Sequence, residues 1–254
     1  MTSKNPLFIS PHQWKKFCTY LLSKNRYILN NEWDNFIKTI LFTAKKRERI
    51  LKKGGPWHRA RIGKKEDKWR IDINPLPPQE IKAPPNKKAC EGRINPRGIS
   101  YLYLANDVKT AISEVRPWLK ESVTVGFFDL IRDLNFVDAS QDKHMSFFFK
   151  KIPTNEPSEK WEQHVWGDIN HSFSVPITTR EEHIYYVPTQ YLSECFKNAG
   201  YDGIIYKSSL TEDGYNIALF TPKNAVLNHA RLFDIKSIAY EFEESANPYK
   251  VKAT

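Results

Sequence analysis

Six prolines stand between residues 63 and 98, and they limit what this part of the chain can form. Proline has a fixed φ and no backbone N–H, so it is excluded from central strands and from helix interiors. The spacing therefore predicts a long, mostly extended loop, and such loops in compact domains tend to be functional covers or insertions. The prolines are Pro75, Pro77, Pro78, Pro84, Pro85 and Pro96.

Beyond this loop, short strand and helix patterns follow one another without a regular period. Helices are predicted over 106–118, with Asn106 or Asp107 as the cap, and over 187–200, whereas 141–187 shows no clear period and is left unassigned. Regular βαβ spacing is missing, so an α+β fold is expected rather than a doubly wound sheet. The predicted strands cover 100–105, 122–128, 134–138, 201–210 and 215–220.

Two amphipathic helix patterns precede the proline-rich loop. The first is expected to begin at Ser10, where a hydroxyl, a first-turn proline and Gln13 form a capping-box pattern. The second is expected to run through the basic stretch 45–53, as a solvated helix face, and to stop at Gly54–Gly55. The sequence therefore predicts a helical extension over 1–55 and a main domain over 56–254.

Charge and cysteine usage narrow the class of protein. Lys and Arg number 39 against 29 Asp and Glu, a net charge of +10, so anionic partners are favoured: nucleic acid, an acidic membrane or a phosphorylated small molecule. Cys18, Cys90 and Cys195 lie far apart, which argues against a structural zinc site or a disulfide framework. No apolar run approaches the ~18 residues of a membrane span, and the N-terminus lacks a signal-peptide core. We therefore expect a soluble, cytoplasmic protein without a metal site.

Four polar positions stand out because each lies near the end of a predicted buried element. On the helix, the 100° step places Glu114 about 60° from Ala111, at the rim of the buried face, so its carboxylate could point into a cleft. The four positions are Arg59, Arg93 in a Gly/Pro turn, Glu114 and the pair Ser208–Ser209.

Two further features bear on a cleft. Tyr103 lies between Leu102 and Leu104 in a strand pattern, so its side chain faces the opposite side from both leucines. Gln190 and Glu194 stand one turn apart on a predicted helix, where they could reach a cleft or form a solvated face.

Each polar position also has a purely structural explanation. Arg93 could bond the carbonyls of its own turn, and Glu114 could pair with Arg116 or Lys120 on the helix surface. Ser208 could be a strand-end hydroxyl in a turn. The residue types alone leave both interpretations open.

Three segments together resemble the RES domain family, named for its arginine, glutamate and serine, whose characterised members are bacterial toxins that consume NAD. They are WHRAR, GRINPRGISYLYLANDVKTAISEVRP and YDGIIYKSSLTEDGYNIALF, and with the elements between them they span roughly residues 56–222. The middle segment is the most specific, since it joins a Gly-Arg-x-Asn-Pro turn to Thr-Ala-x-x-Glu-Val-Arg-Pro on the next helix. The resemblance implies a fold similar to ADP-ribosyl transferases, a split β-sheet core flanked by helices with NAD in the cleft.

Carried onto this sequence, the resemblance implies that Arg59 and Arg93 contact NAD and that Tyr103 lines its pocket. Glu114 would be the key carboxylate and Ser208 the family's serine. Guanidinium groups bind phosphate oxygens bidentately, which suits the pyrophosphate, and Tyr103 could stack on nicotinamide or hydrogen-bond through its hydroxyl. Glu114 would stabilise positive charge on the ribose, and Ser208 would orient Glu114 or a ribose hydroxyl.

The reaction implied is cleavage of the bond between nicotinamide and ribose, with NAD as the substrate and no metal. Attack by phosphate would make the protein an NAD phosphorylase, and attack by water an NAD glycohydrolase. An acceptor side chain would make it a protein ADP-ribosyl transferase. Positive charge near the cleft favours phosphorolysis or hydrolysis over protein modification. The expected protein is a toxin or defence effector whose catalytic domain covers 56–254.

Two rival classes stay open beside the enzyme. A nucleic-acid-binding module would use the stretch 45–53 and the basic loop, with a steeply salt-dependent affinity and no NAD turnover. A catalytically silent member would act by protein interaction through the helical pair at 10–53, which compact RES toxins lack. The partners expected for the enzyme are NAD, inorganic phosphate and an antitoxin or other regulatory protein, with no membrane and no nucleic acid.

Overall fold

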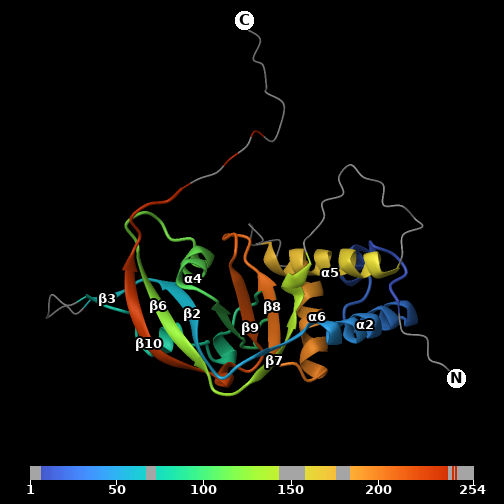
Figure 1. Ribbon diagram of the computed structural model, residues 1–254, viewed down its shortest axis with the longest axis horizontal. Helices are drawn as coiled ribbons and strands as arrows, with labels where there is room; N and C mark the ends of the chain where they lie inside the picture. The colour runs from blue at the N-terminus through green and yellow to red at the C-terminus, as the bar shows by residue number, and fades with distance from the viewer. Residues whose placement is uncertain are drawn as a thin grey trace, which may run out of the picture.

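One eight-stranded sheet runs through the molecule, in the order β1-β7-β8-β9-β5-β2-β6-β10 (Figure 1). The structure is a computed structural model that describes residues 7–66, 73–142, 158–175 and 184–239, with positions 242 and 244. The strands are β1 (Glu48–Leu51), β2 (Gly54–Ile62), β5 (Leu102–Ala105), β6 (Ser122–Leu130), β7 (Leu134–Asp138), β8 (Gly203–Lys207), β9 (Tyr215–Leu219) and β10 (Ala225–Asp234).

The sheet is split between β5 and β2. Within these two described strands, His58 opposite Ala105 is the single pair that joins them. In contrast, β2 pairs with β6 at seven positions, and β5 pairs with β9 along its full length. Because the strands separate beyond His58, the sheet consists of a five-stranded and a three-stranded part that meet at one point. The predicted α+β class is confirmed, and the sheet is split as the family resemblance implies.

Helices cover the sheet in two groups. α4 (Val108–Val115) contacts β2, β5 and β6, and Asp107 caps it as predicted, because the Asp107 carboxylate accepts from the Thr110 N–H at 2.8 Å. The second group lies over the other end of the sheet (Figure 1). It contains α1 (Gln13–Ser23), α2 (Asn31–Ala44), α5 (Ser158–Ser174) and α6 (Val187–Asn198).

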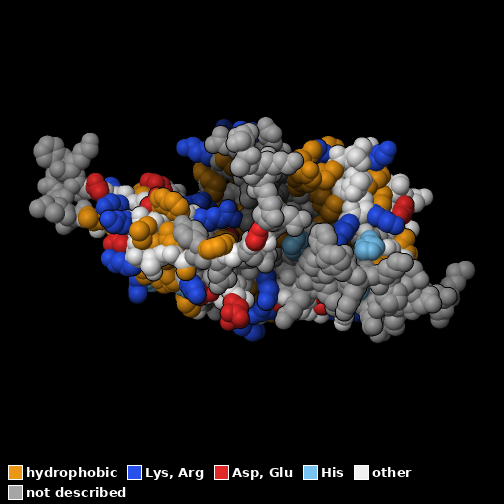
Figure 2. Space-filling view, turned by 90° about the horizontal axis from the view of Figure 1, so that it is seen from above, with side chains coloured by type: hydrophobic (Ala, Val, Ile, Leu, Met, Phe, Trp, Pro, Cys, Tyr) orange, Lys and Arg blue, Asp and Glu red, His pale blue; other side chains and the backbone are white. Residues whose placement is uncertain are grey.

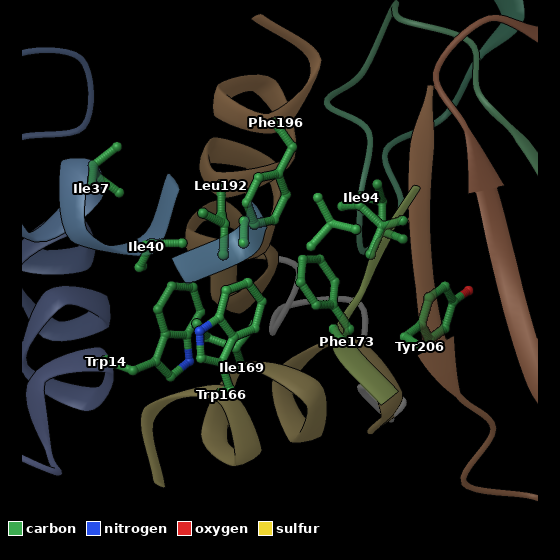
Figure 3. Close-up of a cluster of buried hydrophobic side chains, with 14 of the residues drawn as sticks. Trp14, Ile37, Ile40, Ile94, Trp166, Ile169, Phe173, Leu192, Phe196 and Tyr206 are labelled. Carbon is green, nitrogen blue, oxygen red and sulfur yellow. The ribbon is translucent and has the colours of Figure 1, made fainter. Parts of the chain in front are cut away.

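The second group of helices shares one aromatic core with the sheet (Figure 3). The Trp14 indole of α1 donates to Ser172 Oγ of α5 at 2.8 Å, and the Trp166 indole donates to Thr43 Oγ1 of α2 at 3.0 Å. Trp166 also stacks on Phe196 of α6, with ring centroids 6.2 Å apart. The two N-terminal helices therefore complete the core of α5 and α6. The division of the chain at residue 55 stays a prediction.

The expected continuation of the second helix through 45–53 is wrong. α2 ends at Ala44, Lys45–Arg47 form one 3₁₀ turn, and Glu48–Leu51 pair antiparallel with β7. Arg47 is buried, with its guanidinium 4.5 Å from the Trp166 ring centroid and in an ion pair with Asp142. Burial of this arginine and strand pairing at the sheet edge outweigh the helical pattern.

The sequence pattern does not predict helix α5, because buried polar residues interrupt its apolar pattern. Val165, Trp166, Ile169 and Phe173 are fully buried at helical spacing. Polar side chains on the same helix are also buried, and these are Asp168, Asn170 and Ser174. A pattern of apolar residues alone therefore does not reveal this helix.

The proline-rich segment contains only short elements where it is described. They are β3 (Lys65–Glu66), β4 (Ile73–Asn74), α3 (Pro78–Ile81) and the 3₁₀ turn η2 (Asn86–Lys88). Ile81 and Ile94 are fully buried, so these two side chains anchor the segment to the core. Within the described ranges, no helix has the length and apolar character needed to cross a membrane.

The shared core predicts that damage to α1 destabilises the whole fold. Trp14→Ala should lower the free energy of unfolding by about 3–5 kcal/mol, because it removes a large buried side chain. Tyr27→Ala is the control, since Tyr27 is 91% exposed and its loss should change stability by less than about 0.5 kcal/mol. Urea unfolding followed by fluorescence and circular dichroism should show one shifted transition for Trp14→Ala. A separate early transition that leaves the main midpoint in place would instead indicate an independent helical extension.

Candidate functional site

A pocket of about 310 Å³ lies where the sheet is split. Its walls come from β2, β5, β8, β9 and α4, from the turn before β5 and from the residue before α6. Of the five residues to which the family resemblance gives a role, four line this pocket: Arg59, Arg93, Tyr103 and Glu114. The fifth, Ser208, contacts Glu114.

The Glu114 carboxylate is held by two neutral donors. Its Oε1 atom accepts from Ser208 Oγ at 2.9 Å and from Asn216 Nδ2 at 2.6 Å. Ser208 and Asn216 are both buried, at the end of β8 and in β9. Glu114 therefore does not form the helix-surface pair with Arg116 or Lys120, and Oε2 has no hydrogen-bond partner among the described residues.

Asn216 was missed in the sequence although it left a signal. It directly follows the tyrosine of YNIALF, and the four residues after it are all apolar. It lies opposite Tyr206 in the β8–β9 ladder, and both residues line the pocket. A polar residue in an apolar strand should be read as a candidate for a buried hydrogen bond.

Arg59 is a buried cation without a counter-ion. Arg59 is only 8% exposed, and its Nη1 donates to the Tyr103 carbonyl at 3.2 Å. Nε is buried without a hydrogen-bond partner, and no carboxylate in the described part of the chain forms an ion pair with Arg59. Burial, and secondarily the charge of Arg61, lower the pKa of Arg59 to about 9, so the guanidinium remains charged at neutral pH.

Arg93 binds the C-terminal end of a helix with only part of its guanidinium group. Its Nη1 donates to the carbonyls of Phe173 and Ser174, at 2.9 and 2.7 Å, at the C-terminus of α5. The last carbonyls of a helix lack partners within the helix, so a cation there is favourable. The carbonyls belong to α5 and not to the turn of Arg93 itself, and three of the five guanidinium N–H groups remain free of described partners.

The turn that carries Arg93 is built around Asn95. The Asn95 amide donates to the carbonyls of Cys90 and Ile99, both at 2.9 Å, and Oδ1 accepts from the Tyr103 hydroxyl at 2.6 Å. A Cβ atom on Gly92 would lie 2.8 Å from Asn95 Oδ1, so the closely packed turn requires glycine there. This explains the Gly-Arg-x-Asn-Pro pattern in physical terms.

Gln190 braces the same turn from α6. Its Nε2 donates to the carbonyls of Gly92, at 2.8 Å, and Asn95, at 3.2 Å, and Thr189 donates to the carbonyl of Arg93. Gln190 is therefore neither part of a solvated face nor a free cleft residue, whereas Glu194 is exposed. The sequence could not assign this role, because the contact joins residues almost a hundred positions apart.

Tyr103 presents its ring to the pocket while its hydroxyl is occupied. The hydroxyl donates to Asn95 and accepts from the Ile94 N–H at 3.3 Å. Burial raises the pKa of Tyr103 far above its usual value, so the phenol stays neutral. Of the two roles expected for Tyr103, stacking through the ring is the one that these contacts leave available.

Arg61 is a second pocket residue, after Asn216, that was not predicted from the sequence. It lines the pocket from β2, two positions after Arg59, and it has no hydrogen-bond or ion-pair partner in the described part of the chain. Burial lowers its pKa. Its signal was the period of two in WHRAR, since residues two apart on a strand share a face.

No group of three or more His, Cys, Asp or Glu side chains that could hold a metal ion occurs among the described residues. The pocket lining offers guanidinium groups, three tyrosine rings, one imidazole and one carboxylate.

Comparison with known proteins gives one family match. The family model of the RES domain matches residues 60–240. Among solved structures, one similar chain is described as "Crystal structure of the M.tuberculosis MbcT-MbcA toxin-antitoxin complex". It shares 12% sequence identity and a TM-score of 0.40, over 78% of this chain and 92% of that chain. No curated protein matches the sequence.

The buried charge of Arg59 predicts an unusual effect on stability. Arg59→Met should raise the free energy of unfolding of the unliganded protein at pH 7 by roughly 1 kcal/mol or more, because it removes an uncompensated buried charge. Arg26→Met removes an exposed arginine and should leave stability unchanged within about 0.5 kcal/mol. Both are measured by urea denaturation. A marked loss of stability in Arg59→Met would mean that the guanidinium is mainly a structural donor.

Proposed function

The chain belongs to the RES domain family, and from this premise we propose that it consumes NAD by cleaving the bond between nicotinamide and ribose. RES domain toxins act on NAD. One observation carries the proposal: Arg59 and Glu114 line the same pocket, yet they form no ion pair with each other or with any other described side chain. Unpaired charges of both signs suit NAD, which carries an anionic pyrophosphate and a cationic nicotinamide ring.

The pyrophosphate would bind to Arg59 and Arg93. Guanidinium groups bind phosphate oxygens through two parallel hydrogen bonds and stay charged at working pH. Arg59 has a buried Nε without a partner, and Arg93 keeps three N–H groups after bonding α5. An anion at this place would supply the counter-charge that the folded chain lacks.

Tyr103 would hold the nicotinamide ring by stacking. An aromatic pair contributes roughly 0.5–1.5 kcal/mol beyond the burial of its surface. The Tyr103 ring is fixed by the hydrogen bond to Asn95, so it needs little ordering when the ligand binds.

Glu114 would stabilise the positive charge that develops on the ribose as the glycosidic bond breaks. Such bonds break through a transition state like an oxocarbenium ion, and a nearby carboxylate lowers its free energy. Ser208 and Asn216 hold Oε1, which leaves Oε2 for the sugar. Ser208 acts as a positioning residue because its hydroxyl donates to Glu114, and no His or Lys base contacts it among the described residues.

Phosphate or water is the proposed acceptor, which makes the protein an NAD phosphorylase or glycohydrolase. The cationic lining of the pocket supports an anionic co-substrate. Transfer to a protein side chain is the alternative. We propose a cytoplasmic toxin or defence effector, held in check by an antitoxin or other regulatory protein.

A nucleic-acid-binding role is not favoured by the observed charges. Lys and Arg side chains are scattered over the face in Figure 2 without forming one stripe. The basic stretch 45–53 is largely paired with carboxylates. The ion pairs are Lys46–Glu162, Arg47–Asp142, Arg49–Asp138 and Lys52–Asp133. Counterion release needs free cations on the surface, and this stretch offers few.

The first test of the proposal is loss of NAD. Purified protein should convert NAD to nicotinamide, followed by chromatography with and without inorganic phosphate. Glu114→Gln should slow this by at least about 10²-fold, the usual effect of losing one electrostatic stabiliser of a transition state. Glu32→Gln on the exposed side of α2 is the control and should match the wild type. Equal rates for Glu114→Gln and the wild type would refute the role of the carboxylate, and a phosphorylated product formed only with phosphate would identify phosphorolysis.

The occupied hydroxyl of Tyr103 predicts different effects for two substitutions. Tyr103→Phe should lower the free energy of unfolding by about 1–2 kcal/mol and leave KM for NAD nearly unchanged, because the two lost hydrogen bonds join Tyr103 to Asn95 and to the Ile94 N–H and not to the ligand. Tyr103→Leu should raise KM about tenfold, because the stacking ring is lost. Steady-state kinetics and urea denaturation separate the two. A large fall in kcat for Tyr103→Phe would show instead that the hydroxyl contacts the substrate.

A further inference from the structure

Arg61 is a pocket cation that the proposed function does not use. It stands two positions after Arg59 on β2, where the pairing with β6 is regular, Arg59 opposite Gly126 and Arg61 opposite Thr124. A regular strand places both arginines on one face, with Cα atoms about 7 Å apart. They are close enough that the charge of Arg61 lowers the pKa of Arg59.

The lack of a partner for Arg61 is not a general property of this chain's arginines. Three arginines elsewhere on or beside the sheet each have a carboxylate within 4 Å. The pairs are Arg47–Asp142, Arg49–Asp138 and Arg132–Asp202. Neither arginine of β2 has such a partner in the described chain. Two like charges side by side, partly desolvated, are unfavourable unless an anion joins them.

We propose that Arg61 binds a phosphoryl group in this pocket, next to Arg59. The inference rests on the proposed function, because it assigns a further ligand-binding residue to the same pocket. The chemistry is that of phosphate oxygens, for which the planar guanidinium fork is suited. Two sources can supply it: the pyrophosphate of the dinucleotide, or free orthophosphate that attacks the ribose.

In the second case the reaction balances without a further reactant. An orthophosphate oxygen forms a bond to the ribose carbon while the carbon–nitrogen bond to nicotinamide breaks. The electron pair of that bond goes to the ring nitrogen, so nicotinamide leaves as a neutral molecule. The other product is ADP-ribose phosphorylated at the same carbon.

The test is binding without turnover. Orthophosphate and ADP-ribose are each titrated into the full-length wild-type protein, Arg61→Met, Arg61→Lys and Arg26→Met, by calorimetry in a chloride buffer. The wild type should bind, and Arg61→Met should bind at least one probe about tenfold or more weakly. Arg61→Lys should lie between, because a lysine keeps the charge but loses the fork. Arg26→Met, in the exposed loop between α1 and α2, should bind like the wild type.

The probe that is weakened identifies the source. Weaker binding of ADP-ribose alone assigns Arg61 to the pyrophosphate, weaker binding of orthophosphate alone assigns it to the free acceptor, and weaker binding of both supports a shared phosphoryl site. Unchanged affinity for both probes in Arg61→Met overturns the inference, as does a wild type that binds neither. If thermal unfolding shows that Arg61→Met is not folded, Arg61→Lys decides: affinity within about twofold of the wild type for both probes overturns it.

The result is separable from that of the proposed function. A protein that binds the probes through Arg61 but leaves NAD intact retains this inference and loses the proposed reaction. A protein that cleaves NAD equally well with Arg61→Met, and with unchanged probe affinities, retains the reaction and loses the inference.

Discussion

The pocket is organised around one unfavourable arrangement, a buried guanidinium without a counter-ion among the described residues, at the split of the sheet. The strands β2 and β5 meet only at His58 and Ala105 within the described chain, and the gap beyond them is bridged by Arg59, which donates to the Tyr103 carbonyl. A pocket lies at this split, and the charge of Arg59 in it has no counter-ion among the described residues. The cost is met by the remainder of the fold, since most of the described strands are regularly paired and the helices bury an aromatic core.

The helical layer and the pocket are joined through a short series of contacts. Trp14 of α1 donates to Ser172 of α5, and the next two residues of α5 supply the carbonyls that hold Arg93. Gln190 of α6 then fixes the turn of Arg93 from the other side. The N-terminal helices never reach the pocket, yet they pack on the two helices that set the position of one of its cations. The residues that precede the matched RES domain therefore have a structural role, because they pack on α5 and α6.

The sequence predicted the parts of the site that local patterns determine. The turn, strand and helix of 92–118 lie within one continuous segment, so a cap at Asn106 or Asp107 and the rim position of Glu114 followed from capping chemistry and helical spacing, and the structure shows that Asp107 is the cap. The rest depends on contacts between distant segments. The strand at 48–51 exists because β7 offers it an edge to pair with, and the role of Asn216 exists because its amide on β9 reaches Glu114 of α4. Periodicity describes one segment at a time and carries no information about such neighbours.

The separation of the Glu114 carboxylate from the pocket arginines also matters for catalysis and product release. Had Glu114 paired with an arginine, each would have neutralised the other, but neutral donors hold the carboxylate and a carbonyl receives Arg59. A dinucleotide with a cationic ring can satisfy both charges until the glycosidic bond breaks. In the proposed reaction the positive charge would then leave the ring. The released nicotinamide would be neutral and would no longer be attracted to Glu114, while the anionic product would keep its contacts with the arginines. Such an interaction is strongest as the bond breaks and disappears afterwards. It lowers the activation barrier without retaining the leaving group, as differential binding of the transition state requires.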